Sequence, residues 1–66
     1  MDLETASREN LLWYIDYLSK ELEKELSPEE VFYTGVSYKD YLEGRQYMIR
    51  RLLAANNQLL KVEGNL

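Results

Sequence analysis

The stretch Ser27-Pro28-Glu29-Glu30 decides how this chain folds, because it carries the start signal of a new helix in the middle of a helical sequence. The Ser27 hydroxyl can accept a hydrogen bond from a free N–H of the first helical turn, and the Glu30 carboxylate can accept one from the backbone N–H of Ser27. Pro28 fits the first helical position, where its missing N–H is not needed. Any preceding helix must therefore stop here, and a new one begins at Pro28.

The helix that begins at Pro28 should be short. Gly35 follows as a candidate left-handed cap, so we expect this helix to cover about residues 28–34. The β-branched and aromatic run at residues 31–34 leaves a short strand as an alternative, although a lone strand would have no partner to pair with.

Toward the N-terminus, the spacing of apolar residues predicts a long helix over about residues 4–25. Leucine, glutamate and lysine, which are all good helix formers, dominate this segment. Its apolar residues step by three and four positions, which places them along one side of a helix. The resulting stripe comprises Leu11, Tyr14, Ile15, Leu18 and Leu22.

Toward the C-terminus, a second long helix is expected from about residue 38 to residue 62. Ser37 provides its N-cap, with Asp40 three positions later as a weaker capping box. At 1.5 Å per residue this helix would be about 37 Å long. Its apolar stripe is wide and comprises Tyr38, Tyr41, Leu42, Met48, Ile49, Leu52, Leu53, Leu59 and Leu60.

Together these segments predict an all-α fold over a single domain of residues 1–66. The expected architecture is a helical hairpin of two long antiparallel helices joined by a short helical corner. The charge pattern agrees with it: residues 1–33 hold nine acidic and three basic residues, and residues 34–66 hold three acidic and five basic residues. An acidic arm of net charge −6 and a basic arm of +2 attract each other when the chain folds back on itself.

A hairpin of this size needs additional buried surface. Chains this short bury only about 60% of the surface that their unfolded state exposes. The 66 residues include neither cysteine nor histidine, so disulfides and a structural zinc ion are excluded. We therefore expect self-association, with a dimer favoured, in which hairpins pair into a homo-oligomeric helical bundle.

Two polar residues interrupt the apolar stripe of the C-terminal helix. Arg45 and Asn56 both project along the line of Leu52, where a polar residue can fix register and partner number. Arg45 can reach a carboxylate of the N-terminal helix or of another subunit, or it can contact a ligand or partner. The residues expected in the core or oligomer interface are Leu11, Ile15, Leu18, Leu22, Arg45, Met48, Ile49, Leu52, Asn56 and Leu59.

Gly44 stands beside Arg45 inside the expected helix. Glycine costs about 1 kcal/mol in a helix relative to alanine. We expect it to be tolerated because another backbone comes close to it.

Trp13 breaks the pattern of the N-terminal helix, because it projects almost opposite the apolar stripe, with Tyr17 one turn later and Lys20 beyond. Tryptophan and tyrosine are enriched in binding hot spots. Trp13 can pack on a second copy or on the corner helix, contact a different partner, or stay exposed. Tyr47 lies opposite the stripe of the C-terminal helix. The candidate partner-binding residues are Trp13, Tyr17, Lys20 and Tyr47.

An acidic residue recurs every seven positions in the first half of the chain. These residues are Asp2, Glu9, Asp16, Glu23 and Glu30. A row of carboxylates can imitate a phosphate backbone and occupy a nucleic-acid-binding protein. The other interpretation is the solvated outer side that amphipathic helices have.

Several function classes are disfavoured. Without histidine or cysteine there is no ready general base or nucleophile, and the sequence has no phosphate loop, dinucleotide fingerprint or calcium loop. We expect no enzyme, no cofactor and no metal. Direct nucleic-acid binding is disfavoured because Arg50 and Arg51 diverge around their helix beside the acidic arm.

No membrane association is expected. The longest apolar run of the N-terminal helix, Leu11 to Ile15, is far shorter than the roughly 20 residues of a membrane span. The start of the chain is acidic, unlike a signal peptide. We therefore expect the cytoplasm, of a cell or of an infected host.

What remains is a small non-catalytic protein–protein interaction module. It associates with itself, or covers a surface of a larger protein as an adaptor, inhibitor or accessory factor, or does both, and an acidic nucleic-acid mimic is the alternative. In general character, such a compact acidic helical chain resembles the small accessory proteins of bacteriophages and prophages.

Overall fold

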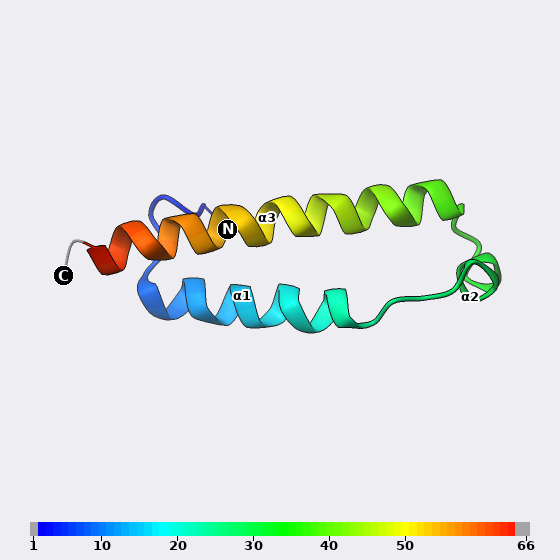
Figure 1. The fold of residues 1–66 in the computed structure, drawn as a ribbon, viewed down its shortest axis with the longest axis horizontal. Helices are drawn as coiled ribbons and strands as arrows, with labels where there is room; N and C mark the ends of the chain where they lie inside the picture. Colours follow the sequence, from blue (N-terminus) through cyan, green and yellow to red (C-terminus); the bar gives the residue numbers. More distant parts are fainter. Residues whose placement is uncertain (1, 65–66) are drawn as a thin grey trace.

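The computed structural model describes residues 2–64 and has the predicted all-α architecture (Figure 1). Its helices are α1 (Arg8–Glu23), α2 (Pro28–Tyr33) and α3 (Tyr38–Gly64). The helices α1 and α3 lie side by side and antiparallel, and α2 forms the corner at the far end of the hairpin (Figure 1). Residues 1, 65 and 66 of the expected domain lie outside the described residues.

The corner forms as its sequence predicts. The Ser27 hydroxyl accepts a hydrogen bond from the backbone N–H of Glu30 at 3.2 Å, and the Glu30 carboxylate accepts one from the N–H of Ser27 at 3.2 Å. Residues 31–33 are helical, so the strand alternative does not hold, and Gly35 has a φ of +82°. Glycine adopts this left-handed conformation without steric cost, and it ends α2 after six residues.

The first long helix begins later than expected, at Arg8 instead of residue 4. The reason is a second cap: the Ser7 hydroxyl accepts a hydrogen bond from the N–H of Asn10 at 3.2 Å, while the Ser7 backbone is extended. Residues 2–6 form a turn before this cap, in which an Asp2 carboxylate oxygen accepts from the N–H of Glu4 at 3.1 Å.

One narrow seam joins α1 and α3. The buried and half-buried positions of α3 include a row that advances in steps of four and three, the spacing of the core positions in a coiled coil, with the half-buried Arg51 and Gln58 beside it. Only Leu11, Leu18 and Ala55 are fully buried between the two long helices. The seam comprises Leu11, Ile15, Leu18 and Leu22 of α1 and Tyr41, Arg45, Met48, Leu52, Ala55, Leu59 and Val62 of α3.

Near the corner, polar contacts fasten the end of α1 to α3. The Arg45 guanidinium donates to the backbone carbonyl of Leu22 at 3.1 Å, and the Tyr41 hydroxyl accepts from the N–H of Leu26 at 2.8 Å. The last carbonyl groups of a helix have no partner within the helix. Arg45 therefore satisfies one of the carbonyl groups at the end of α1.

Candidate protein-interaction surfaces

The seam divides the surface of the hairpin into two faces, and one side-chain contact tells them apart. Tyr14 precedes the seam residue Ile15 by one position, and Arg51 precedes the seam residue Leu52 by one position. The Arg51 Nε donates to the Tyr14 hydroxyl at 3.0 Å, so both side chains lie on the same face. Positions just before seam residues therefore lie on this face, and positions just after them lie on the opposite face.

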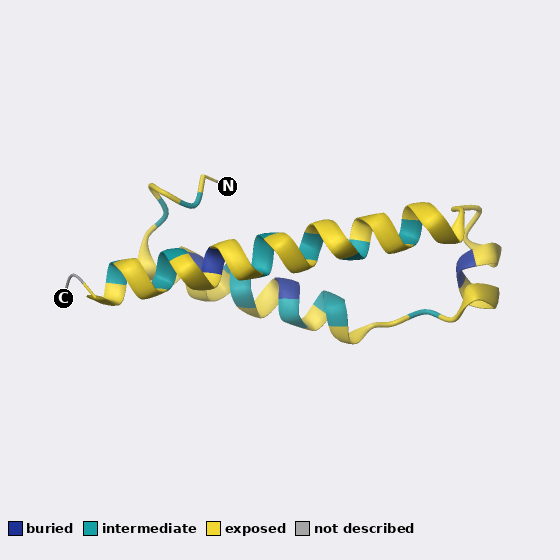
Figure 2. Cartoon of the chain, turned by 45° about the horizontal axis from the view of Figure 1, so that its top comes forward, coloured by how far each residue is buried: buried dark blue, intermediate teal, exposed yellow. Residues whose placement is uncertain are grey.

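Several positions just after the seam residues carry exposed apolar side chains, four of them on α3, whereas on α1 only Leu12 is apolar and Asp16, Ser19 and Glu23 take the equivalent positions. Leu53 on α3 is 61% exposed. Leu42, Ile49 and Leu60 lie along the same side of α3, and the four residues follow each other at spacings of seven, four and seven. Figure 2 shows how exposed residues alternate with half-buried ones along α3. Exposed leucine and isoleucine side chains that share one side of a helix are candidates for an interaction site. We call Leu12, Leu42, Ile49, Leu53 and Leu60 the apolar face.

Two residues of the expected core or oligomer interface lie outside the seam. Ile49 and Asn56 are exposed and follow the seam residues Met48 and Ala55 by one position. The Asn56 side chain donates to the carbonyl of Leu52, four residues earlier in its own helix, at 3.0 Å. The expectation that Asn56 lies in line with the seam is wrong for the hairpin, because the step of three from Leu52 places Ala55 there.

Arg45 lies in the seam as expected, but it uses a different partner. The expectation was a carboxylate, whereas the guanidinium donates to the carbonyl of Leu22. It also lies over the Tyr41 ring, with 5.9 Å from its central carbon to the ring centroid. The carbonyl group and the ring thus stabilise the half-buried guanidinium of Arg45, and no carboxylate has to be buried beside it.

Trp13 and Tyr17 lie on the outer side of α1. Their rings stack with centroids 5.7 Å apart and an interplanar angle of 6°, and they are 63% and 47% exposed. They line an open hollow together with Asp16 and Lys20. The Lys20 Nζ lies 2.9 Å from an Asp16 carboxylate oxygen, and this hydrogen bond raises the pKa of Lys20 above its usual value. Three of the predicted partner-binding residues therefore gather in one place, which we call the aromatic site.

Tyr47, the fourth predicted partner-binding residue, lies on α3 and is 62% exposed. It stands one turn before Arg51, whose guanidinium lies over the Tyr14 ring at 5.3 Å from the centroid. The hydrogen bond to the Tyr14 hydroxyl raises the pKa of Arg51, and Tyr47 adds a smaller contribution in the same direction. Tyr47 thus lies with Tyr14 and Arg51 on the side of the hairpin opposite the apolar face, and we call this side the polar face.

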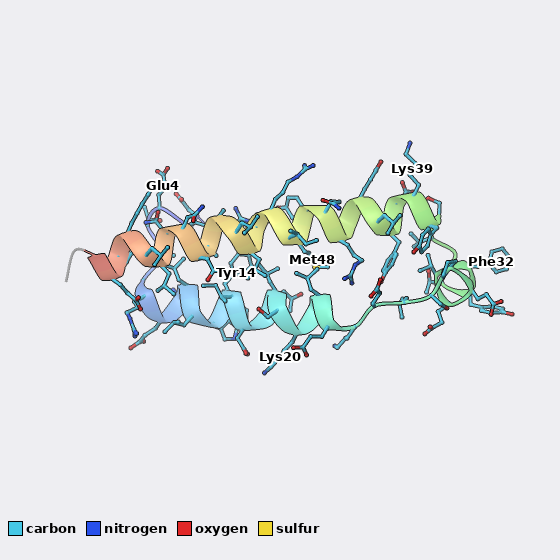
Figure 3. All side chains as sticks on the ribbon, viewed as in Figure 1. Glu4, Tyr14, Lys20, Phe32, Lys39 and Met48 are labelled. Atoms are coloured by element: carbon cyan, nitrogen blue, oxygen red, sulfur yellow. The ribbon has the colours of Figure 1, made fainter. Side chains whose placement is uncertain are left out.

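The tip of the hairpin exposes two aromatic residues that sequence reasoning did not single out. Phe32 and Tyr33 are among the most exposed apolar side chains, with their rings in an edge-on arrangement at 5.8 Å. Figure 3 shows Phe32 projecting from the end of the hairpin. The sequence does indicate that these rings are exposed. Ser27 and Gly35 restrict α2 to six residues, and a helix so short buries only one side, here through Val31.

The acidic row is shorter in the structure than in the sequence. Glu9, Asp16 and Glu23 are exposed on α1, but Asp2 belongs to the N-terminal turn and Glu30 to the capping box of α2. The seven-residue repeat therefore places only three carboxylates in a row on one helix.

Within residues 2–64, no group of three or more aspartate, glutamate, histidine or cysteine side chains is placed to hold a metal ion. No helix in this range combines the length and hydropathy needed to cross a bilayer. Comparison with models of protein families, with curated proteins and with solved structures finds no match for the chain.

Proposed function

We propose that this chain is a non-catalytic protein–protein interaction module that pairs with a second copy of itself through the apolar face. Two hairpins that meet in this way form a four-helix bundle. The observation that carries the proposal is the row of exposed leucine and isoleucine side chains on one side of the hairpin, opposite a polar face.

The small core of the single hairpin supports this proposal. Among residues 2–64 only Leu11, Leu18, Val31 and Ala55 are fully buried, which is little for an independently stable domain. Complete burial of one exposed leucine is worth about 1.5–3 kcal/mol. Covering the apolar face therefore supplies stability that one hairpin lacks.

The charges favour one arrangement of the two copies. In a symmetric dimer the same patch is used twice, so α1 meets either α1 or α3 of the partner. Helix α1 has four acidic and two basic residues, a net charge of −2, and α3 has three acidic and five basic residues, a net charge of +2. Opposite charges favour α1 against the partner's α3, with both corners at the same end of the bundle.

The proposal is tested by two matched substitutions on opposite sides of α3. Leu53 and Tyr47 are 61% and 62% exposed, so in a monomer either change to glutamine is nearly neutral. We expect Leu53→Gln to raise the dissociation constant of the dimer about tenfold or more, since each dimer loses two leucines from its interface. Tyr47→Gln should leave it unchanged.

Sedimentation over a range of concentrations measures the dimer dissociation constants of Leu53→Gln and Tyr47→Gln. An equal effect of the two substitutions, or none from Leu53→Gln, would contradict pairing through the apolar face. Circular dichroism checks that both variants keep the helical content of the original chain.

A hetero-partner is a second candidate, and the exposed aromatic site on the outer side of α1 favours it. An adaptor or inhibitor would use that surface while the apolar face forms the dimer. An acidic nucleic-acid mimic has weaker support, because Lys20 neutralises Asp16, the middle carboxylate of the row on α1. For either role the cytoplasm, of a cell or of an infected host, is the compartment that we propose.

A further inference from the structure

We propose that the aromatic site on α1 binds a basic segment of another protein, with an arginine side chain of that segment stacked on Trp13 and Tyr17. Neighbouring basic residues of the segment would then meet the exposed carboxylates of α1. Neither Trp13 nor Tyr17 belongs to the apolar face, so binding to their rings does not depend on dimerisation.

The position of the site keeps it open. Trp13 lies two positions after the seam residue Leu11 and two positions before the seam residue Ile15, so it points away from α3. Figure 3 shows that Lys20, one turn from Tyr17, also lies on the side of α1 turned away from α3. A second hairpin packed on the apolar face would therefore leave Trp13 and Tyr17 exposed.

The Trp13 and Tyr17 rings stack on each other and remain largely exposed, so a cation can approach the outer side of the stack. Their interplanar angle of 6° makes the two aromatic faces nearly parallel. Tryptophan is the strongest aromatic partner for a cation, and a planar guanidinium stacks on such a surface better than an ammonium group does. The chain uses the same contact internally, since Arg45 lies over Tyr41 at 5.9 Å and Arg51 over Tyr14 at 5.3 Å.

The surrounding charge selects a basic partner. Glu9 lies one turn before Trp13, and Glu23 lines the same hollow as Trp13; both are exposed, and neither is the carboxylate that pairs with Lys20. The nearby bases are engaged: Lys20 pairs with Asp16 at 2.9 Å, and Lys24 pairs with Glu21 at 3.4 Å. Residues 1–33 carry a net charge of −6, so an acidic segment would be repelled and a basic one attracted.

A titration with defined peptides tests the inference on the full chain. Trp13 is the only tryptophan, so its fluorescence reports directly on the site. We expect nona-arginine to change this fluorescence in a saturable way, and to bind about fivefold more tightly than nona-lysine of the same charge.

Two substitutions separate stacking from general charge attraction. Calorimetric titration with nona-arginine should show binding weakened about fivefold or more by Trp13→Ala. Phe32→Ala should leave it unchanged, because it removes an exposed aromatic ring from the tip of the hairpin without changing the charge. Tyr17→Ala provides a second variant with the same expected loss as Trp13→Ala.

Other outcomes would overturn the inference. Equal affinities of Trp13→Ala, Phe32→Ala and the original chain would mean that charge alone attracts the peptide. Conversion of the chain to a smaller species by Trp13→Ala would place the aromatic site in an interface between copies. Leu53→Gln should leave peptide binding intact even where it abolishes the dimer, so failure of one proposal can be told from failure of the other.

Discussion

At the scale of single residues, the stability of the hairpin depends on very few buried side chains. Leu11 and Ala55 are completely buried and Leu18 is 3% exposed, and these three residues join the two long helices. Arg45 adds a hydrogen bond to the end of α1 at 3.1 Å. The loss of any one of these contacts removes a large share of the whole core.

We therefore expect Leu18→Ala to lower the free energy of unfolding by about 2–5 kcal/mol, the cost of a cavity left by a buried leucine. This is a large part of the total stability of a small domain. Urea denaturation followed by circular dichroism measures the change. Tyr47→Ala, at an exposed position on the polar face, serves as the control and should change the free energy by less than about 0.5 kcal/mol. An unaltered denaturation midpoint for Leu18→Ala would show that the core lies elsewhere.

At the scale of helices, the ends were predictable where the side chains carry a complete signal. Ser27 and Glu30 form both hydrogen bonds of the capping box, and α2 begins at Pro28 as expected. The start of α1 was missed because Ser7 is followed three residues later by Asn10, which is not the glutamate or glutamine of a capping box. A serine cap of this kind is not distinguishable in the sequence from an ordinary helical serine.

Which side of α3 packs against α1 could not be predicted from the sequence, for a different reason. Its apolar residues belong to two rows, the seam and the apolar face, which are adjacent on the helix. In the sequence they merge into one wide stripe, and a line drawn through its middle passes through Asn56. Only the packing of α1 shows that Ala55 belongs to the inner row and Leu53 to the outer one.

Gly44 gives a prediction at the scale of helices. The expected close backbone is absent there, because a Cβ built on Gly44 meets nothing within 4 Å among the described residues. Gly44→Ala should therefore stabilise α3 by about 1 kcal/mol through helix propensity alone. Gly35→Ala is the matched control, and it should destabilise the chain because its φ of +82° is strained for alanine. Thermal unfolding of both variants decides the matter: a lower melting temperature for Gly44→Ala would mean that another surface packs against it.

At the scale of the whole molecule, the hairpin is a thin rod of about 47 × 16 × 15 Å. Contacts hold it together at both ends, with Arg8 paired to Glu63 at 3.2 Å at the open end and Arg45 bound to Leu22 near the corner. Two packed helices bury only the narrow seam between them, so leucines elsewhere on the rod, such as Leu53 and Leu60, stay exposed. The exposed apolar row is therefore the feature that the pairing of two hairpins would explain.

The molar mass in solution tests this pairing most directly. Light scattering at micromolar concentration should give about twice the chain mass of 7.9 kDa, and the value should fall on dilution as the dimer dissociates. A constant mass of one chain up to the highest attainable concentration, with the helical content intact, would contradict the proposed pairing of two hairpins.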